Sequence, residues 1–148
     1  MIQRFERFSF NIFEISHCWH KLAAEEMEKH GLRGPHAIYL LAILRSSKGL
    51  TAADLCEMCR RDKADVSRAV RLMEQKGFIA RQGGQYRAVL TLTAEGRRAA
   101  EQICERAAMA VEVTGTGFSE AERETFYKVL DTITCNMKQL TKDGIPHT

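Results

Sequence analysis

The chain has 148 residues, of which 45% are hydrophobic and 28% charged, and it contains five cysteines. This composition is typical of a folded domain with its own apolar core, and it excludes a disordered or collagen-like chain. No run of about 18 apolar residues is present, which argues against a transmembrane helix, and the first residues lack the features of a signal peptide. With an odd number of scattered cysteines as well, we expect a cytoplasmic protein with reduced thiols.

Charge is distributed unevenly along the chain. Residues 1–44 have no net charge, residues 45–98 hold twelve Lys/Arg against six Asp/Glu, and residues 99–148 hold five against eight. A segment with a net charge of +6 between neutral and acidic flanks is expected when one part of a protein binds a polyanion. The middle segment is therefore the predicted site of contact with nucleic acid.

Two helices are predicted in the first third of the chain. Apolar residues recur at three- to five-residue steps from Phe8 to Met27, which predicts a helix over about residues 8–30 that ends at Gly31. A second helix over about residues 35–46 begins with Pro35 at its first position. This helix is apolar around most of its circumference, so we expect it to be central and buried.

The basic segment begins with two short helices. Thr51 is a suitable cap for a helix that extends to Cys59, and Asp62 for a second helix that stops at Gly77. Only Cys59, Arg60 and Arg61 lie between them. Two short helices joined by so tight a turn predict a helix-turn-helix.

Two strand-like runs follow, FIARQ and QYRAVLTL, separated by Gly83 and Gly84. This pattern favours a hairpin with a two-residue loop, in which Ile79 lies opposite Ala88 and Arg81 opposite Tyr86. The predicted fold is mainly α with a small β-hairpin wing. We expect a winged helix-turn-helix lobe over residues 35–92.

The remaining chain predicts two flanking helices. Thr93 begins one over about residues 94–113, and a capping box of Ser119 and Glu122 begins another. Exposing the apolar stripes of the two ends would cost several kcal/mol at ~25 cal/mol per Å², so we expect residues 1–34 and 93–148 to be arms of a twofold homodimer. The predicted interface residues are Phe5, Phe8, Ile12, Phe126, Leu130, Ile133, Met137 and Leu140. A monomeric helical cap over the core is the alternative.

The helix after Asp62 has two different faces. Val66, Ala69, Val70 and Met73 share one face as core positions, and the opposite face is polar and cationic, as suits a DNA major groove. The predicted DNA-binding residues are Lys63, Asp65, Ser67, Arg68 and Arg71 on this helix, and Arg81, Gln85, Tyr86 and Arg87 in the wing. Arg68 or Arg71 would read guanine or contact phosphate. Asp65 would accept from cytosine, orient Arg68 or lie outside the groove. A solvated helix face is the alternative for the whole set.

Three blocks, GLTAADLC, DKADVSRAVRLMEQKGFIAR and LTLTAEGRR, resemble the multiple-antibiotic-resistance regulator (MarR) family. The resemblance implies a bacterial or archaeal winged-helix transcriptional regulator, a homodimer that binds a palindromic DNA site. It also implies a protein that often represses and is often released by a small effector held between arms and lobe. The effector residues expected on this basis are His17, Trp19, His20, His36 and Tyr39. Two departures are a wing without the family's Asp-Arg-Arg, and Asp65 where Ser or Thr is common.

Other functions remain as alternatives. A winged helix can also bind proteins, and His17 with His20, Cys56 with Cys59, or Cys18 would suit a metal- or thiol-sensing regulator that still binds DNA. We expect no metal site, because a structural zinc needs four ligands and a catalytic one at least three. The sequence has no phosphate-binding glycine loop, nucleophile elbow or metalloprotease helix, so we expect no enzyme and no cofactor.

Overall fold

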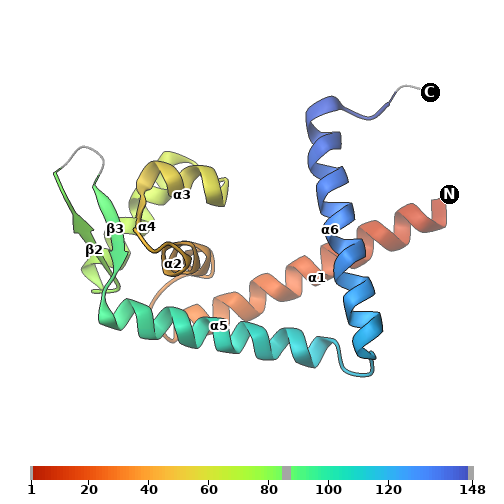
Figure 1. The fold of residues 1–148 in the computed structure, drawn as a ribbon, viewed down its shortest axis with the longest axis horizontal. Helices are drawn as coiled ribbons and strands as arrows, with labels where there is room; N and C mark the ends of the chain where they lie inside the picture. Colours follow the sequence, from red (N-terminus) through yellow and green to blue (C-terminus); the bar gives the residue numbers. More distant parts are fainter. Residues whose placement is uncertain (1, 85–87, 147–148) are drawn as a thin grey trace. The chain divides into compact units, whose positions relative to one another are not determined.

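A computed structural model describes residues 2–84 and 88–146 of the protein. The elements are α1 (Ile2–Glu28), α2 (His36–Arg45), β1 (Leu50–Thr51), α3 (Ala52–Cys59), α4 (Lys63–Gln75), β2 (Ile79–Gln82), β3 (Val89–Leu92), α5 (Ala94–Thr114) and α6 (Glu120–Asp143) (Figure 1). This is the predicted mainly α fold with a β wing. The chain forms two compact units, Met1–Ala108 and Met109–Thr148.

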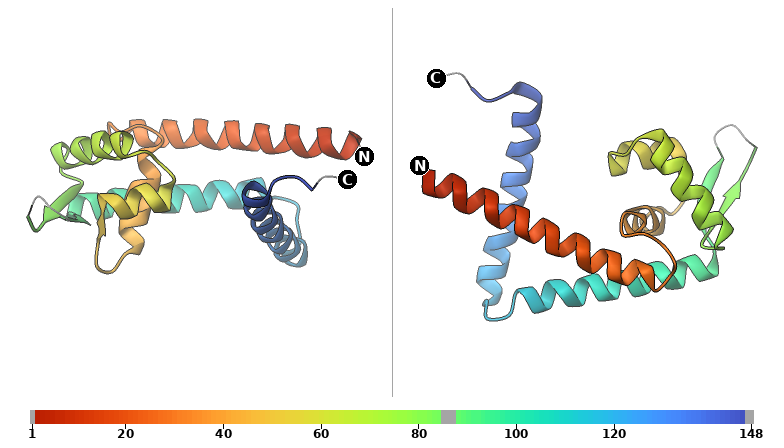
Figure 2. Two further views of the ribbon diagram at one scale, coloured as in Figure 1. Left: turned by 90° about the horizontal axis from the view of Figure 1, so that it is seen from above. Right: turned by 180° about the vertical axis from the view of Figure 1, so that it is seen from behind.

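Helix α1 is longer at its start than the sequence pattern predicts. It begins at Ile2 rather than Phe8 and runs without a break to Glu28 (Figure 2). The residues before Phe8 include neither Gly nor Pro, so nothing stops the helix from extending past its apolar stripe. At the other end, Gly31 has a positive φ of 63°, and the N–H of Leu32 donates to the carbonyl oxygen of Met27 at 3.0 Å. These are the features of a glycine-terminated helix, as predicted.

The core of the first unit is formed by α2, the helix-turn-helix, the sheet, the end of α1 and the first half of α5. Tyr39, Leu40 and Ile43 of α2 are almost fully buried, although Ile38 is 47% exposed, so α2 is not buried on every side. The predicted core face of α4 is confirmed by its buried residues, Val66, Ala69, Val70 and Met73. Burying one face of α4 leaves its other face to solvent.

Both predicted caps of the helix-turn-helix are present. The hydroxyl of Thr51 accepts from the N–H of Asp54, and the Asp54 carboxylate accepts from the N–H of Thr51 at 2.8 Å. The carboxylate of Asp62 accepts from the N–H of Asp65 at 2.8 Å. Between the helices, Arg60 adopts a left-handed conformation with φ of 50°. The Thr51 cap therefore fixes where α3 begins, and the Asp62 cap fixes where α4 begins.

The sheet differs from the predicted hairpin in two respects. It has three strands in the order β1-β3-β2, because Leu50–Thr51 pairs with Val89 and Leu90. Ile79 lies opposite Leu92 rather than Ala88, so the predicted two-residue loop at Gly83 and Gly84 is wrong. The strand pairing that the sequence predicted for Tyr86 falls among residues 85–87, which are outside the described chain.

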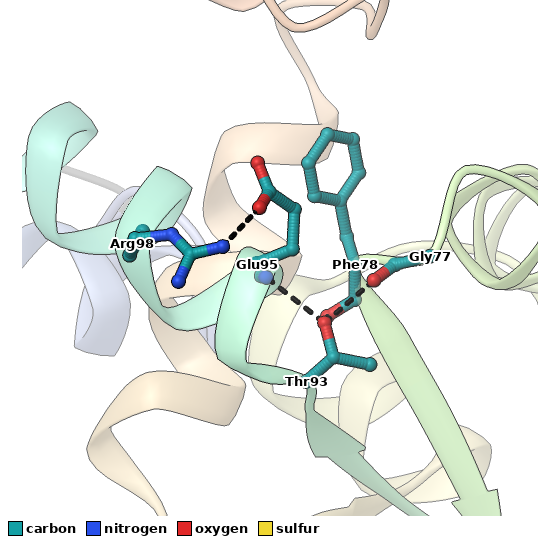
Figure 3. A network of polar contacts seen from close by, with 6 residues as sticks. Gly77, Phe78, Thr93, Glu95 and Arg98 are labelled. Carbon is teal, nitrogen blue, oxygen red and sulfur yellow. Dashed lines mark hydrogen bonds and ion pairs between the residues drawn. The ribbon is translucent and has the colours of Figure 1, made fainter.

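The wing joins α5 through a close contact of backbone segments (Figure 3). The hydroxyl of Thr93 donates to the carbonyl oxygen of Gly77 at 2.5 Å and accepts from the N–H of Gly96 at 3.0 Å. The N–H of Thr93 donates to the carbonyl oxygen of Phe78 at 3.1 Å. Glu95 and Arg98 form an ion pair one turn along α5. Thr93 therefore caps α5, as predicted, and also ties it to the end of α4.

The second unit contains the end of α5, a turn and α6. The guanidinium of Arg123 donates to the carbonyl oxygen of Gly115 at 3.0 Å and pairs with the carboxylate of Glu112 at 3.1 Å. Ser119 and Glu122 form the predicted capping box at the start of α6. Within the described residues, no helix has the length and apolar character needed to cross a bilayer.

Candidate nucleic-acid interface

The solvent face of α4 is cationic. Its exposed side chains include Lys63, Ser67, Arg68 and Arg71, which we call the α4 ridge. Arg60 and Arg61, in the turn before α4, are exposed as well. In the sequence these two arginines define the turn, and their charges are part of the +6 that points to this segment as the DNA contact. The α4 ridge and these two arginines therefore give six exposed polar residues, five of them basic, on the turn and on α4.

Asp65 is the one predicted DNA contact on α4 that is directed partly inward. Its carboxylate accepts a hydrogen bond of 3.0 Å from the hydroxyl of Tyr39, a side chain with no exposed surface on α2. Its second oxygen lies 3.7 Å from the guanidinium of Arg68. Burial, followed by the hydrogen bond to Asp65, raises the pKa of Tyr39 to about 12, so the phenol is a donor at neutral pH. Asp65 thus connects the core to the α4 ridge.

Arg81 of the wing is engaged with α4. Its guanidinium donates to both carboxylate oxygens of Glu74, at 3.0 and 2.9 Å. The hydrogen bond from Arg81 lowers the pKa of Glu74, and the same bond raises the pKa of Arg81. The other three predicted wing contacts, Gln85, Tyr86 and Arg87, lie outside the described residues. The described wing therefore offers an arginine that already has a partner.

The predicted effector residues fall into two groups. His36 is 7% exposed, accepts from the N–H of Arg33 at Nδ1 (3.1 Å) and has its ring centroid 6.4 Å from that of Tyr39. Burial lowers the pKa of His36, and the nearby Arg33 lowers it further. His17, Trp19 and His20 are instead exposed on α1, with His17 stacked on Phe13 and His20 Nδ1 3.3 Å from the hydroxyl of Ser16. A shared effector pocket stays a prediction.

The described cysteines and histidines are spread over several elements. In the part of the chain that the structure describes, no three potential ligands are gathered closely enough to hold an ion. Cys59 is buried, and this burial raises the pKa of its thiol, whereas Cys56 is half-buried. Cys18 is exposed, with its sulfur 3.9 Å from a carboxylate oxygen of Glu14.

The predicted dimer residues lie on two largely uncovered helices. On α1, Phe5 is 69%, Phe8 41% and Ile12 45% exposed. On α6, Phe126 and Met137 are about half exposed, Leu140 is at 36%, and Leu130 and Ile133 are half-buried. No residue of α6 is fully buried. Large apolar side chains so exposed along two long helices are typical of a surface that another molecule covers.

The chain is similar to a known protein family and to several solved structures. Residues 30–99 match the MarR family. A MarR-family regulator from Listeria monocytogenes, solved with a 26mer DNA, is 22% identical, with a TM-score of 0.77 over 93% of this chain and 95% of that one. A MarR regulator from Methanosarcina mazei is 18% identical, with a TM-score of 0.81 over 91% and 92% of the two chains.

A third solved structure is a complex of MepR with DNA, from Staphylococcus aureus. It is 22% identical to this chain and has a TM-score of 0.76, over 87% of this chain and 97% of the other. No curated protein sequence matched the chain. At these identities the solved structures establish the fold, and the sequence match over residues 30–99 establishes the resemblance to the MarR family.

Proposed function

Residues 30–99 carry the match to the MarR family, and on this basis we propose that the protein is a homodimeric transcriptional regulator that binds double-stranded DNA. Proteins of this family are regulators rather than enzymes. The proposed site is a palindromic duplex, and the proposed compartment is the cytoplasm of a bacterium or archaeon. We further propose that the protein represses transcription and is released from DNA by a small molecule.

The outward-facing α4 ridge is the observation that carries this proposal. Its side chains are exposed because the opposite face of α4 is packed into the core, and the Asp62 cap fixes the start of the helix. A major groove admits one α-helix, and exposed arginines suit both guanine edges and phosphates. Lys63, Ser67, Arg68 and Arg71 are the residues proposed to enter the groove.

The dimer is supported by the exposed apolar faces of α1 and α6. A second copy that covers both faces would remove this surface from water, and most soluble oligomers are twofold dimers. A twofold axis also explains a palindromic site, since each α4 would meet one half-site. The two copies of α4 would then lie about 34 Å apart, one helical turn of DNA.

The experiment is a titration of the protein with random duplex DNA at several salt concentrations, followed by selection of bound sequences from a randomised library. Because neutralising phosphates releases counterions, affinity should fall steeply as salt rises. The selected sequences should contain two inverted half-sites. Affinity for duplex that does not depend on salt, or no bound sequence at all, would contradict the proposal.

Two substitutions test the residues within the site. Arg68→Ala should lower specific binding by ~1–3 kcal/mol and alter the base preference if Arg68 reads a base. If Arg71 contacts phosphate, Arg71→Ala should weaken binding to all sequences equally and reduce the salt dependence by about one counterion. Lys138→Ala, which removes a cation from exposed α6, is the control and should change neither property. Unchanged affinity in both arginine variants would exclude the α4 ridge.

A further inference from the structure

We propose that Tyr39 acts through Asp65 as a positioning residue that holds Arg68 for contact with a guanine base. This inference rests on the proposed DNA-binding function and adds a determinant of specificity that lies outside the DNA-facing surface. Its basis is a chain of three side chains that leads from the buried core to the exposed α4 ridge.

The chain of contacts begins at Tyr39, whose side chain is held in place by the core around it. Tyr39 has no exposed surface and is packed within the core cluster of α2 and α4. Its hydroxyl donates to one oxygen of Asp65 at 3.0 Å. The phenol stays protonated over the whole neutral range because its pKa is raised to about 12. Asp65 therefore has a fixed donor on its inner side at any pH at which the protein would bind DNA.

The other oxygen of Asp65 faces the solvent side of α4. It lies 3.7 Å from a terminal nitrogen of Arg68, whose side chain is 72% exposed. Asp65 and Arg68 are three residues apart on one helix, so they are neighbours on its surface. A guanidinium has five N–H donors in a planar fork, and one edge facing Asp65 leaves other donors for a ligand. An arginine limited in this way loses less conformational entropy when it binds.

The same geometry argues against direct contact between Asp65 and DNA. A free carboxylate facing a major groove would be repelled by the phosphates. Here one oxygen is occupied by Tyr39 and the other is nearest Arg68, so the negative charge is turned toward the protein's own donors. Arg68 remains as the group that extends outward. Arginine paired with the O6 and N7 atoms of guanine is the commonest specific contact in the major groove.

The test compares base preferences rather than affinities alone. Sequences bound from a duplex library with a randomised centre are recovered, at one salt concentration, for the wild type, Tyr39→Phe, Asp65→Asn, Arg68→Ala and the double variant Tyr39→Phe/Arg68→Ala. Tyr39→Phe keeps the buried ring and removes only the donor. Tyr127→Phe, which removes a hydroxyl from a half-exposed tyrosine of α6, is the matched control. Thermal unfolding of each variant reports on the fold.

We expect the wild type to prefer guanine at one position of each half-site, by about 5- to 150-fold over other bases. Arg68→Ala should abolish that preference. Tyr39→Phe and Asp65→Asn should each reduce it at the same position, by about five-fold for the lost tyrosine hydrogen bond, with other positions unchanged. In the Arg68→Ala background, Tyr39→Phe should have no further effect on base preference.

Two results would overturn the inference while leaving DNA binding intact. One is a Tyr39→Phe variant that keeps the full guanine preference of the wild type. The other is a loss spread equally over all positions that persists without Arg68, which is what a purely structural role would give. If Tyr39→Phe does not fold, Asp65→Asn decides the question by the same criteria. If the wild type binds no duplex at all, the proposed function itself fails, and this is a distinguishable result.

Discussion

The guanidinium of Arg81 and the carboxylate of Glu74 join β2 to the last turn of α4 by two hydrogen bonds, of 3.0 Å from Nε and 2.9 Å from Nη2. Two parallel bonds between a planar donor and a planar acceptor fix orientation as well as distance. The base of the wing is therefore set relative to the proposed recognition helix. This arrangement suits Arg81 to positioning the wing, and the DNA contact predicted for Arg81 stays a prediction.

A double-mutant cycle on Arg81 and Glu74 separates these two roles. Both side chains are partly exposed, at 43% and 29%, so each single alanine variant should lower the free energy of unfolding by about 0.5–1 kcal/mol. The double variant should lose little more, because the second residue then has no partner. Urea unfolding gives all four values. Additive losses would show that the pair is not coupled.

The same variants should be compared for binding to duplex DNA. If Arg81 only positions the wing, Arg81→Ala and Glu74→Ala should weaken binding to a similar degree and leave its salt dependence unchanged. If Arg81 contacts a phosphate, only Arg81→Ala should weaken binding and lower the salt slope by about one. A stronger binding of Glu74→Ala would also indicate that Arg81 reaches DNA once it is released.

The junction between the wing and α5 predicts a strict requirement for glycine at position 96. A Cβ there would lie 1.7 Å from the carbonyl oxygen of Phe78, so the backbone at one of these two residues would have to shift. Gly96→Ala should therefore lower the free energy of unfolding by about 2 kcal/mol or more, despite the ~1 kcal/mol that alanine contributes to a helix. The measurement is urea unfolding monitored by circular dichroism.

Gly84→Ala is the control for this prediction. A Cβ at Gly84 meets no atom within 4 Å, so the change in the free energy of unfolding should be below about 1 kcal/mol. Equal stabilities of the two variants would contradict the packing of Gly96 against Phe78.

The helices could be predicted from sequence because their signals are local. Thr51, Asp62 and Ser119 cap helices within three residues of themselves, and the core face of α4 follows from helical spacing. The strand register could not be predicted in the same way. The observed pairing of Ile79 with Leu92 is shifted by four residues from the predicted partner, Ala88. An even shift keeps every side chain on its face, so the apolar pattern fits both registers equally well.

The missed features of the candidate site involve residues far apart in the sequence. Tyr39 and Asp65 are 26 residues apart, and no periodic pattern in either segment reports their contact. Strand β1 has only two residues, too few for alternation to be visible, and it exists because Leu50 and Thr51 pair with β3. Glu74 and Arg81 are seven residues apart across the glycine turn at Gly77. In each case tertiary structure supplies the partner.

The buried His36 predicts that stability falls in mildly acidic solution. Its pKa is lowered from 6.5, chiefly by burial, so the unfolded chain takes up a proton before the folded one does. The stabilising contribution is therefore complete above pH 6.5 and is lost as the pH falls through the lower, folded-state pKa. The carboxylates of Glu26, Glu74 and Glu122 also have lowered pKa values, but their losses begin only near their ordinary value of 4.5.

Urea unfolding at pH 7.5 and 5.5 measures this effect. His36→Asn keeps an acceptor near the N–H of Arg33 but does not titrate, so its stability should change less between the two pH values than that of the wild type. An identical pH dependence in both proteins would assign the effect to other groups.

The last prediction concerns the dimer. Ile133 lies on the apolar stripe of α6 with Leu130 and Met137 and is half-buried in a single copy. If a second copy covers this stripe, Ile133→Glu would bury an unpaired carboxylate in the interface, at a cost of several kcal/mol. We expect light scattering to show a dimer for the wild type at micromolar concentration and a monomer for Ile133→Glu. Lys128→Gln changes the net charge by the same amount at an exposed position away from the stripe, and it should remain dimeric. A wild type that is monomeric at this concentration, or an Ile133→Glu variant that stays dimeric while folded, would exclude the α6 stripe as the interface.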